Sequence, residues 1–114
     1  LGVTFKANTD DMRDSSSLQM VPWLSKKGAI IKYFDPTGYK TEFIKFKNVI
    51  NKTSIKDAVH GADLVIIHTE WNDFKSINFK SLVKGKKFMI FDMRNIYSSS
   101  KIKDQGFKYF SVGK

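Results

Sequence analysis

The sequence predicts an α/β protein with a Rossmann-like, doubly wound and mainly parallel sheet of about six strands, with helices on both faces. Short apolar runs alternate along the chain with stretches of helical spacing, and this alternation is typical of strand–helix–strand crossovers. Two of the runs are apolar over several consecutive residues, as in strands that are buried on both faces. Glycines follow most of the helical stretches and mark where they end.

Six strands are expected from the apolar runs. The first is the end of a strand at residues 1–4, and the others are 29–34, 49–50, 63–69, 87–92 and 107–112. The clearest is 63–69, because no polar residue interrupts 64–67. The short first run suggests one domain, residues 1–114, whose first strand is truncated.

Helices are expected between these strands. They are residues 15–27, 54–61, 78–84 and 98–105, with a weaker candidate at 37–46. The first carries Leu18, Val21 and Leu24 at helical spacing. Because Pro22 falls inside it, we expect a kink or a start close to this residue.

The composition excludes several classes of protein. The 114 residues include no cysteine, which excludes a disulfide scaffold, a zinc–thiolate site and a cysteine nucleophile. The two histidines, His60 and His68, cannot form a three-histidine metal site, and no metal is expected. No apolar run approaches the roughly 20 residues of a membrane helix. We find no signal-peptide pattern, and we expect a cytoplasmic protein cut from a larger one.

The net charge indicates an anionic partner. Lysine and arginine number 20 and the acidic residues 11, so the formal charge is +9. Such a charge suits nucleic acid, a membrane surface or a phosphorylated small molecule. The charge alone does not choose among them.

Polar and aromatic residues follow three of the expected strands at the point where each ends. They are Phe5, Lys6 and Arg13 after the first strand, Glu70 and Trp71 after the fourth, and Arg94 after the fifth. In an open parallel sheet these ends share one edge, and ligands bind there. Guanidinium groups and a helix N-terminus suit phosphate, and aromatic faces suit a base. The sequence therefore predicts a nucleotide or diphosphate site.

Each of these residues has a structural alternative. Arg13 could form a surface ion pair with Asp11, and Arg94 could pair with Asp92 to fix a loop. We expect His68, inside a buried strand, to be a hydrogen-bonded core histidine rather than a catalyst. The remaining alternatives are a solvated Lys6, core or cap positions for Phe5 and Trp71, and a loop cap for Glu70.

Glycine-rich phosphate-binding motifs are missing. No G-x-G-x-x-G follows the first strand, and no G-x-x-x-x-G-K-[ST] occurs in the chain. Gly2 stands alone before residues 3–5. NAD binding by this domain on its own is therefore not expected.

Several segments together resemble a known family. They are residues 2–6 (GVTFK), 9–15 (TDDMRDS), 33–36 (YFDP), 61–63 and 69–74 (GAD and TEWNDF), 92–97 (DMRNIY) and the closing 106–113. In this order, over nearly the whole chain, they resemble the C-terminal UDP-binding domain of the UDP-glucose/GDP-mannose dehydrogenase family. One departure is Ala7, where the family usually has proline.

The resemblance implies a function. Family members oxidise the C6 hydroxyl of UDP-glucose to a carboxylate in two NAD-dependent steps. An N-terminal Rossmann domain holds the NAD, a central helical region supports a homodimer, and a cysteine forms the covalent intermediates. Carried over, Phe5, Lys6 and Arg94 would contact the nucleotide sugar, and Arg13 would reach toward the cofactor. Glu70 and Trp71 would shape the pocket. Without a cysteine, this chain is expected to bind the UDP-sugar but not to oxidise it.

Two alternatives stay open. A sister enzyme of the same family would act on UDP-N-acetylmannosamine or GDP-mannose, although residues 69–71 and 92–97 look more like the UDP-glucose branch. A basic nucleic-acid-binding module would use the aromatic residues interleaved with lysines at 43–47 and 107–110. We expect those aromatic residues to lie in the core instead, with the lysines in solvent.

Overall fold

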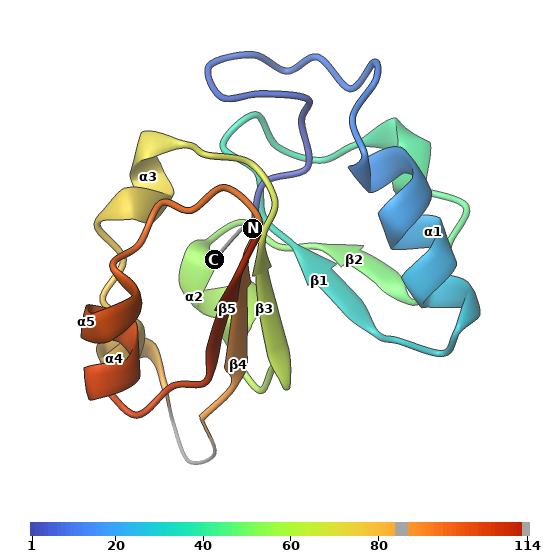
Figure 1. The fold of residues 1–114 in the computed structure, drawn as a ribbon. Coiled ribbons are helices and arrows are strands. Elements are labelled where there is room, and N and C mark those ends of the chain that lie inside the picture. Colours follow the sequence, from blue (N-terminus) through green and yellow to red (C-terminus); the bar gives the residue numbers. More distant parts are fainter. Residues whose placement is uncertain (84–86, 113–114) are drawn as a thin grey trace.

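Parallel strands form two small sheets. The computed structural model describes residues 1–83 and 87–112. β1 (Ile31–Tyr33) pairs with β2 (Val49–Asn51), and β4 (Met89–Asp92) lies between β3 (Leu64–Ile67) and β5 (Tyr109–Ser111) (Figure 1). Every pairing is parallel, which confirms the parallel α/β class. The single sheet of about six strands is not confirmed, because the described strands divide into sheets of two and three.

Short helices connect the strands. They are α1 (Ser17–Lys26), the 3-10 helix η1 (Thr41–Phe43), α2 (Ile55–Val59), α3 (Asn72–Lys75), α4 (Phe79–Leu82) and α5 (Ser99–Asp104). The helix at 15–27 is confirmed as α1, which continues through Pro22. The expected helix at 37–46 is wrong except for the single turn of η1. The expected ends at residue 84 and at residue 113 lie outside the described residues.

Two apolar clusters stabilise the two halves. The larger lies between the three-stranded sheet and α3, α4 and α5, with Phe74, Phe79 and Ile90 fully buried at its centre (Figure 1). The smaller lies beside β1 and α1, and it joins Tyr33 and Phe43 edge to face at 5.4 Å between ring centroids. The helices of the larger cluster cover one face of the three-stranded sheet. Its other face exposes Leu64, Met89, Phe91 and Phe110, so the expected burial of both faces is not found there.

Residues 1–4 lie between the two sheets. The nitrogen of Leu1 donates to the Ile66 carbonyl at 2.6 Å, and the His68 amide donates to the Leu1 carbonyl at 2.9 Å. On the other side, the Gly2 amide donates to the Phe34 carbonyl at 2.8 Å. The structure assigns no strand to these residues, but their hydrogen bonds connect the two halves.

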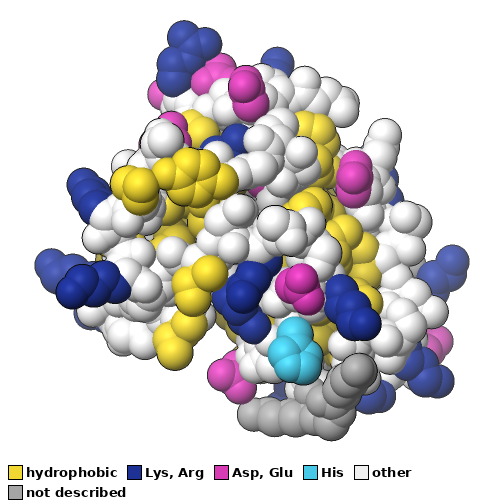
Figure 2. Space-filling model, turned by 180° about the vertical axis from the view of Figure 1, so that it is seen from behind, with side chains coloured by type: hydrophobic (Ala, Val, Ile, Leu, Met, Phe, Trp, Pro, Cys, Tyr) yellow, Lys and Arg dark blue, Asp and Glu magenta, His cyan; other side chains and the backbone are white. Residues whose placement is uncertain are grey.

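The surface is rich in basic side chains. Figure 2 shows them mostly around the outline of the back face, with apolar side chains visible between them. Within residues 1–83 and 87–112, no helix combines the length and the apolar character needed to cross a membrane.

Candidate binding site at the carboxyl ends of the strands

The loop after β4 is built around the carboxylate of Asp92. This side chain is fully buried, and it accepts hydrogen bonds from the amides of Arg94 (3.0 Å), Ile96 (2.8 Å) and Tyr97 (3.1 Å). The Tyr109 hydroxyl donates a fourth, at 2.7 Å. Four donors replace the water that the charge loses on burial. The sharp turn of residues 92–97 is therefore fixed, and the position of Arg94 with it.

Arg94 reaches from this loop to two neighbouring segments. Its Nε donates to the His68 carbonyl at 2.8 Å, and its Nη2 donates to the Phe5 carbonyl at 3.2 Å. In the part of the chain that the structure describes, no carboxylate pairs with its guanidinium. Neutral carbonyls thus hold a positive charge where residues 3–16, the first loop, which precedes α1, meet the ends of β3 and β4.

A second buried carboxylate, that of Asp35, holds the start of the first loop. Asp35 accepts from the amides of Val3 (2.8 Å) and Thr4 (3.3 Å). Farther along, the Phe5 amide donates to the Asp11 carbonyl at 2.9 Å and closes the loop. These bonds fix the backbone on which Phe5 and the adjacent Lys6 stand.

Phe5 and Lys6 both project from this fixed backbone to the surface. The side chain of Phe5 is 44% exposed although it is a large apolar residue, and Lys6 is exposed. The hydrogen bond from Arg94 to the Phe5 carbonyl brings these two residues together at the edge where the strands end, and Lys6 is the next residue in the chain.

Arg13 makes a different contact. Its Nε and Nη2 donate to the two carboxylate oxygens of Asp11, at 3.1 and 3.0 Å. The hydrogen bonds from Arg13 hold the pKa of the Asp11 carboxyl below its usual value. The Arg13 side chain is 88% exposed. The surface ion pair left open by the sequence is thus present, and among the described residues no hydrogen bond or ion pair joins Arg13 to Arg94.

Trp71 and Glu70 occupy unlike positions. Trp71 is only 8% exposed and belongs to the larger apolar cluster, where its Nε1 donates to Thr4 Oγ1 at 3.3 Å. The ring therefore supports the first loop from inside and offers little face to a ligand. Glu70 is exposed beside it.

His68 lies in the core beneath the start of α1. It is 2% exposed, and its Nε2 and Nδ1 lie 2.8 Å from Ser16 Oγ and 3.0 Å from Thr69 Oγ1. Burial, followed by the positive charges of the chain nitrogen and Arg94, lowers its pKa to about 4. The expectation of a hydrogen-bonded core histidine is confirmed.

The backbone amides at the start of α1 are less available to a ligand than the sequence suggested. The Ser17 amide donates to Ser15 Oγ, the Leu18 amide to the Ser15 carbonyl, and the Gln19 amide to the Ser16 carbonyl. These first-turn amides are satisfied by the chain itself, so the helix N-terminus offers little to a phosphate.

Sequence reasoning missed Asp35, and it named Asp92 only as a possible ion-pair partner of Arg94. The structure shows that Asp92 fixes its loop through backbone amides, including that of Arg94, and not through the guanidinium. Both were visible as single acidic residues at the end of an apolar run, Asp35 directly before proline. An acidic residue at a buried strand end must find several donors, and this rule would have identified them.

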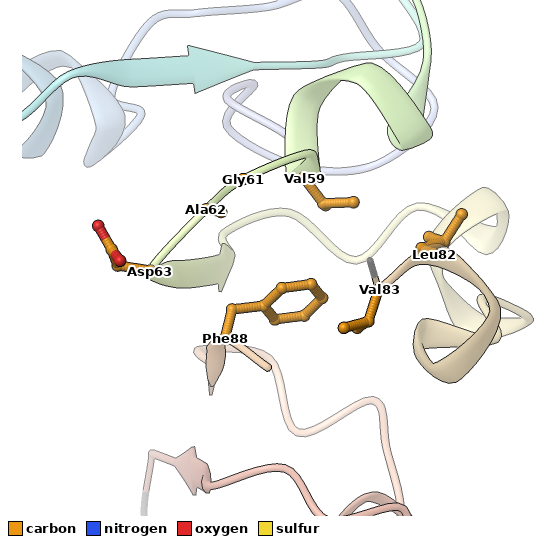
Figure 3. Close-up of a pocket in the computed structure, with 7 residues that line it drawn as sticks. All are labelled: Val59, Gly61, Ala62, Asp63, Leu82, Val83 and Phe88. Atoms are coloured by element: carbon orange, nitrogen blue, oxygen red, sulfur yellow. The ribbon is translucent and has the colours of Figure 1, made fainter. Parts of the chain in front are cut away.

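A small cavity lies at the opposite edge of the sheet. Figure 3 shows Phe88 pointing toward Val59 and Val83, with Asp63 at the rim. Its volume is about 100 Å³. Asp63 and Phe88 come directly before β3 and β4, so this cavity faces the amino ends of the strands. It is not part of the site around Arg94.

Gly2, the lone glycine near the first expected strand, is closely packed. A Cβ added to Gly2 would lie 2.6 Å from the Thr69 Cβ and 3.0 Å from Phe74. Gly2 thus serves close packing inside the domain, not the approach of a pyrophosphate. The guanidinium of Arg94, which has no carboxylate partner among the described residues, suits an anion. The chain has no cysteine to act as a nucleophile.

Most of the interleaved aromatic residues belong to the core. Phe43, Phe107 and Tyr109 are buried, while Phe110 is exposed on β5, where it pairs with the exposed Phe91 of β4. A run of stacking faces for nucleic acid therefore does not form from these segments.

Comparisons with known proteins identify the family of the chain. Residues 1–99 match the family model "UDP-glucose/GDP-mannose dehydrogenase family, UDP binding domain". The UDP-glucose 6-dehydrogenases of Rickettsia felis and Rhizobium meliloti are each 36% identical to the chain, over 99% and 100% of its length and 26% of their own. The chain thus spans about a quarter of these relatives. A solved UDP-D-ManNAc dehydrogenase from Pyrococcus horikoshii shares the fold, with a TM-score of 0.68 and 24% identity over 98% of this chain and 24% of that one.

Proposed function

Since the chain belongs to the UDP-glucose/GDP-mannose dehydrogenase family, we propose that it is the UDP-binding domain of an NAD-dependent UDP-glucose 6-dehydrogenase, which converts UDP-glucose to UDP-glucuronate. The relatives at 36% identity that bear this name support the choice of sugar. The domain binds the nucleotide sugar. The rest of the enzyme, a homodimer, supplies the NAD site and the nucleophile.

One observation supports this proposal above the others: the guanidinium of Arg94 has no acidic partner in the described chain and is aimed by two carbonyls. If a carboxylate were paired with Arg94, the charge of the guanidinium would already be neutralised and less available to a ligand. Its remaining N–H groups can donate to the diphosphate, and such charge-assisted bonds are stronger than neutral ones.

Lys6 and Phe5 complete the proposed contacts. Lys6 adds a second positive charge at the same edge, and the exposed ring of Phe5 offers a flat face to uracil or ribose. We assign Glu70 and Trp71 to the shape of the pocket, Trp71 by supporting Thr4. Arg13, whose side chain is 88% exposed, is assigned to the side facing the cofactor domain.

Calorimetric titration with UDP and UDP-glucose tests the proposal. Arg94→Gln should weaken binding roughly 10- to 100-fold, since hydrogen bonds to charged groups contribute about 1.5–3 kcal/mol. Lys6→Ala should also weaken the binding of UDP and UDP-glucose. Lys108→Ala is the matched control, because it removes one positive charge directly before β5, at the opposite edge. Unchanged affinity in both site variants would exclude the site.

A second titration separates the candidate substrates. UDP-glucose, UDP-N-acetylmannosamine and GDP-mannose differ in base or sugar, so competition against UDP ranks them directly. We expect UDP-glucose to bind best and GDP-mannose worst. Preference for GDP-mannose would move the chain to another branch of the family.

A further inference from the structure

Lys40 is a buried lysine in the connection between β1 and η1. It is 6% exposed, although lysine is almost never buried to this extent without a partner. Its backbone amide donates to the Tyr33 hydroxyl at 2.9 Å, and its Nζ donates to Thr37 Oγ1 at 2.5 Å. Within the described residues its ammonium forms no direct ion pair. The burial of this charge therefore needs another source of stabilisation.

The Thr37 hydroxyl connects this ammonium to the carboxylate of Asp35. Thr37 Oγ1 lies 2.6 Å from Asp35 Oδ1. Because a hydroxyl has one hydrogen and two lone pairs, Thr37 donates to the carboxylate and accepts from the ammonium. The two bonds place the opposite charges at most about 5 Å apart, where their attraction is strong in surroundings with little water. Lys40, Thr37 and Asp35 thus form a chain of hydrogen bonds, the Lys40 relay.

The other oxygen of Asp35 holds the start of the first loop. Asp35 Oδ2 accepts from the amides of Val3 and Thr4, and Phe5 and Lys6 follow directly in the chain. The connection from β1 to η1 runs beside this loop (Figure 1). The relay engages Oδ1 and so fixes the rotation of the carboxylate, which keeps Oδ2 directed at the two amides.

We propose that Lys40 is a positioning residue of the nucleotide site, acting through Thr37 and Asp35 on the backbone that carries Phe5 and Lys6. This inference rests on the proposed function, because it names a further residue on which UDP affinity depends. Hydrogen bonds in series polarise one another, so the ammonium strengthens the hold of Thr37 on the carboxylate. A loop that is already ordered loses less conformational freedom when the ligand binds.

Three substitutions and a control test the relay. Lys40→Met removes the charge but keeps an unbranched side chain of similar length. Thr37→Val replaces the hydroxyl by a methyl group at an exposed residue, and Thr37→Ser keeps the hydroxyl. Lys47→Met is the matched control, because it removes one positive charge from an exposed lysine between η1 and β2.

Hydrogen exchange measures the hold on the loop. The amides of Val3 and Thr4 should exchange roughly three- to tenfold faster in Lys40→Met and in Thr37→Val, the size expected for weakening of one hydrogen bond. The amides of Ile96 and Tyr97, which donate to Asp92, should keep their rates. Thr37→Ser and Lys47→Met should match the parent at all four amides.

Calorimetric titration with UDP measures the effect on the site. Lys40→Met and Thr37→Val should each weaken UDP binding roughly three- to tenfold, by the same loss of one hydrogen bond. The double variant should bind UDP no more weakly than either single variant, because both substitutions interrupt one relay. Thr37→Ser should restore the affinity of the parent, and Lys47→Met should leave it unchanged.

Several results would overturn the proposal. One is equal exchange and equal UDP affinity in Lys40→Met and Lys47→Met. A second is faster exchange at Val3 and Thr4 without a loss of affinity, since Lys40 would then only stabilise the loop. A third is equal acceleration at the amides bound to Asp92, which means a general loss of stability.

Two features keep the test decisive. If Lys40→Met does not fold, Thr37→Val against Thr37→Ser makes the same comparison at an exposed position. A parent chain that binds neither UDP nor UDP-glucose would refute the proposed function, whereas the exchange rates of Val3 and Thr4 would still decide whether the relay holds the loop.

Discussion

Asp92→Asn should destabilise the fold and weaken nucleotide binding together. One oxygen of the carboxylate accepts from Ile96, Tyr97 and Tyr109, and the other from Arg94. An asparagine can place its oxygen toward the first three, but its NH2 then faces the Arg94 amide. One charge-assisted bond is lost, three are weakened, and a buried donor meets a donor. We expect a loss on the order of 2–4 kcal/mol in the free energy of unfolding.

Urea unfolding followed by tryptophan fluorescence measures this loss. Asp104→Asn, at the exposed end of α5, is the matched control and should change the free energy of unfolding by less than about 0.5 kcal/mol. Titration with UDP at low temperature, where the variant stays folded, should show weaker binding because the backbone that carries Arg94 is loosened. A variant that unfolds within about 0.5 kcal/mol of the parent would refute this account of the loop.

Two further predictions concern the buried region behind the site. Gly2→Ala should lower the free energy of unfolding by on the order of 2–4 kcal/mol, because its Cβ would lie 2.6 Å from the Thr69 Cβ and its φ is +78°. Gly38→Ala is the control for the backbone strain alone, since Gly38 has φ +89° and open space around it. Equal losses of stability in the two variants on thermal unfolding would contradict the packing role of Gly2. His68 stays neutral in the folded state because its pKa is about 4 against 6.5, so the stability it contributes is present above pH 6.5 and is lost as the pH falls toward 4. His68→Asn should remove up to roughly 3 kcal/mol of that pH dependence, measured by urea unfolding at several pH values. An unchanged profile in this variant would contradict the account of His68.

Most of the strands could be predicted because their apolar runs are local features. Residues 29–34, 63–69 and 87–92 contain β1, β3 and β4. The helix expected at 37–46 failed for a tertiary reason. The Tyr33 hydroxyl accepts from the Lys40 amide at 2.9 Å and holds Lys40 in an extended conformation, so that only the turn of η1 remains.

The site could be predicted in its outline and not in its details. The meeting of Arg94 with the first loop follows from the rule that parallel strands end at one edge, and the contact with Phe5 agrees with it. Trp71 is buried in the larger apolar cluster and donates to Thr4, 67 positions away in the chain, and the spacing of residues could not show these contacts. Arg13 had an acidic neighbour on either side, and spacing alone could not decide whether it would pair with one of them.

Asp35 and Asp92 explain why the site is shaped before any ligand binds. Each is fully buried at the carboxyl end of a parallel strand region, and each accepts hydrogen bonds from the amides of the loop that carries a proposed contact residue. Asp35 also accepts from the amide and hydroxyl of Thr37, at 2.9 and 2.6 Å. A loop ordered in this way loses little conformational freedom on binding, so more of the interaction with a diphosphate appears as affinity. It follows that residues with no access to the ligand should influence its affinity as strongly as the exposed Lys6 does.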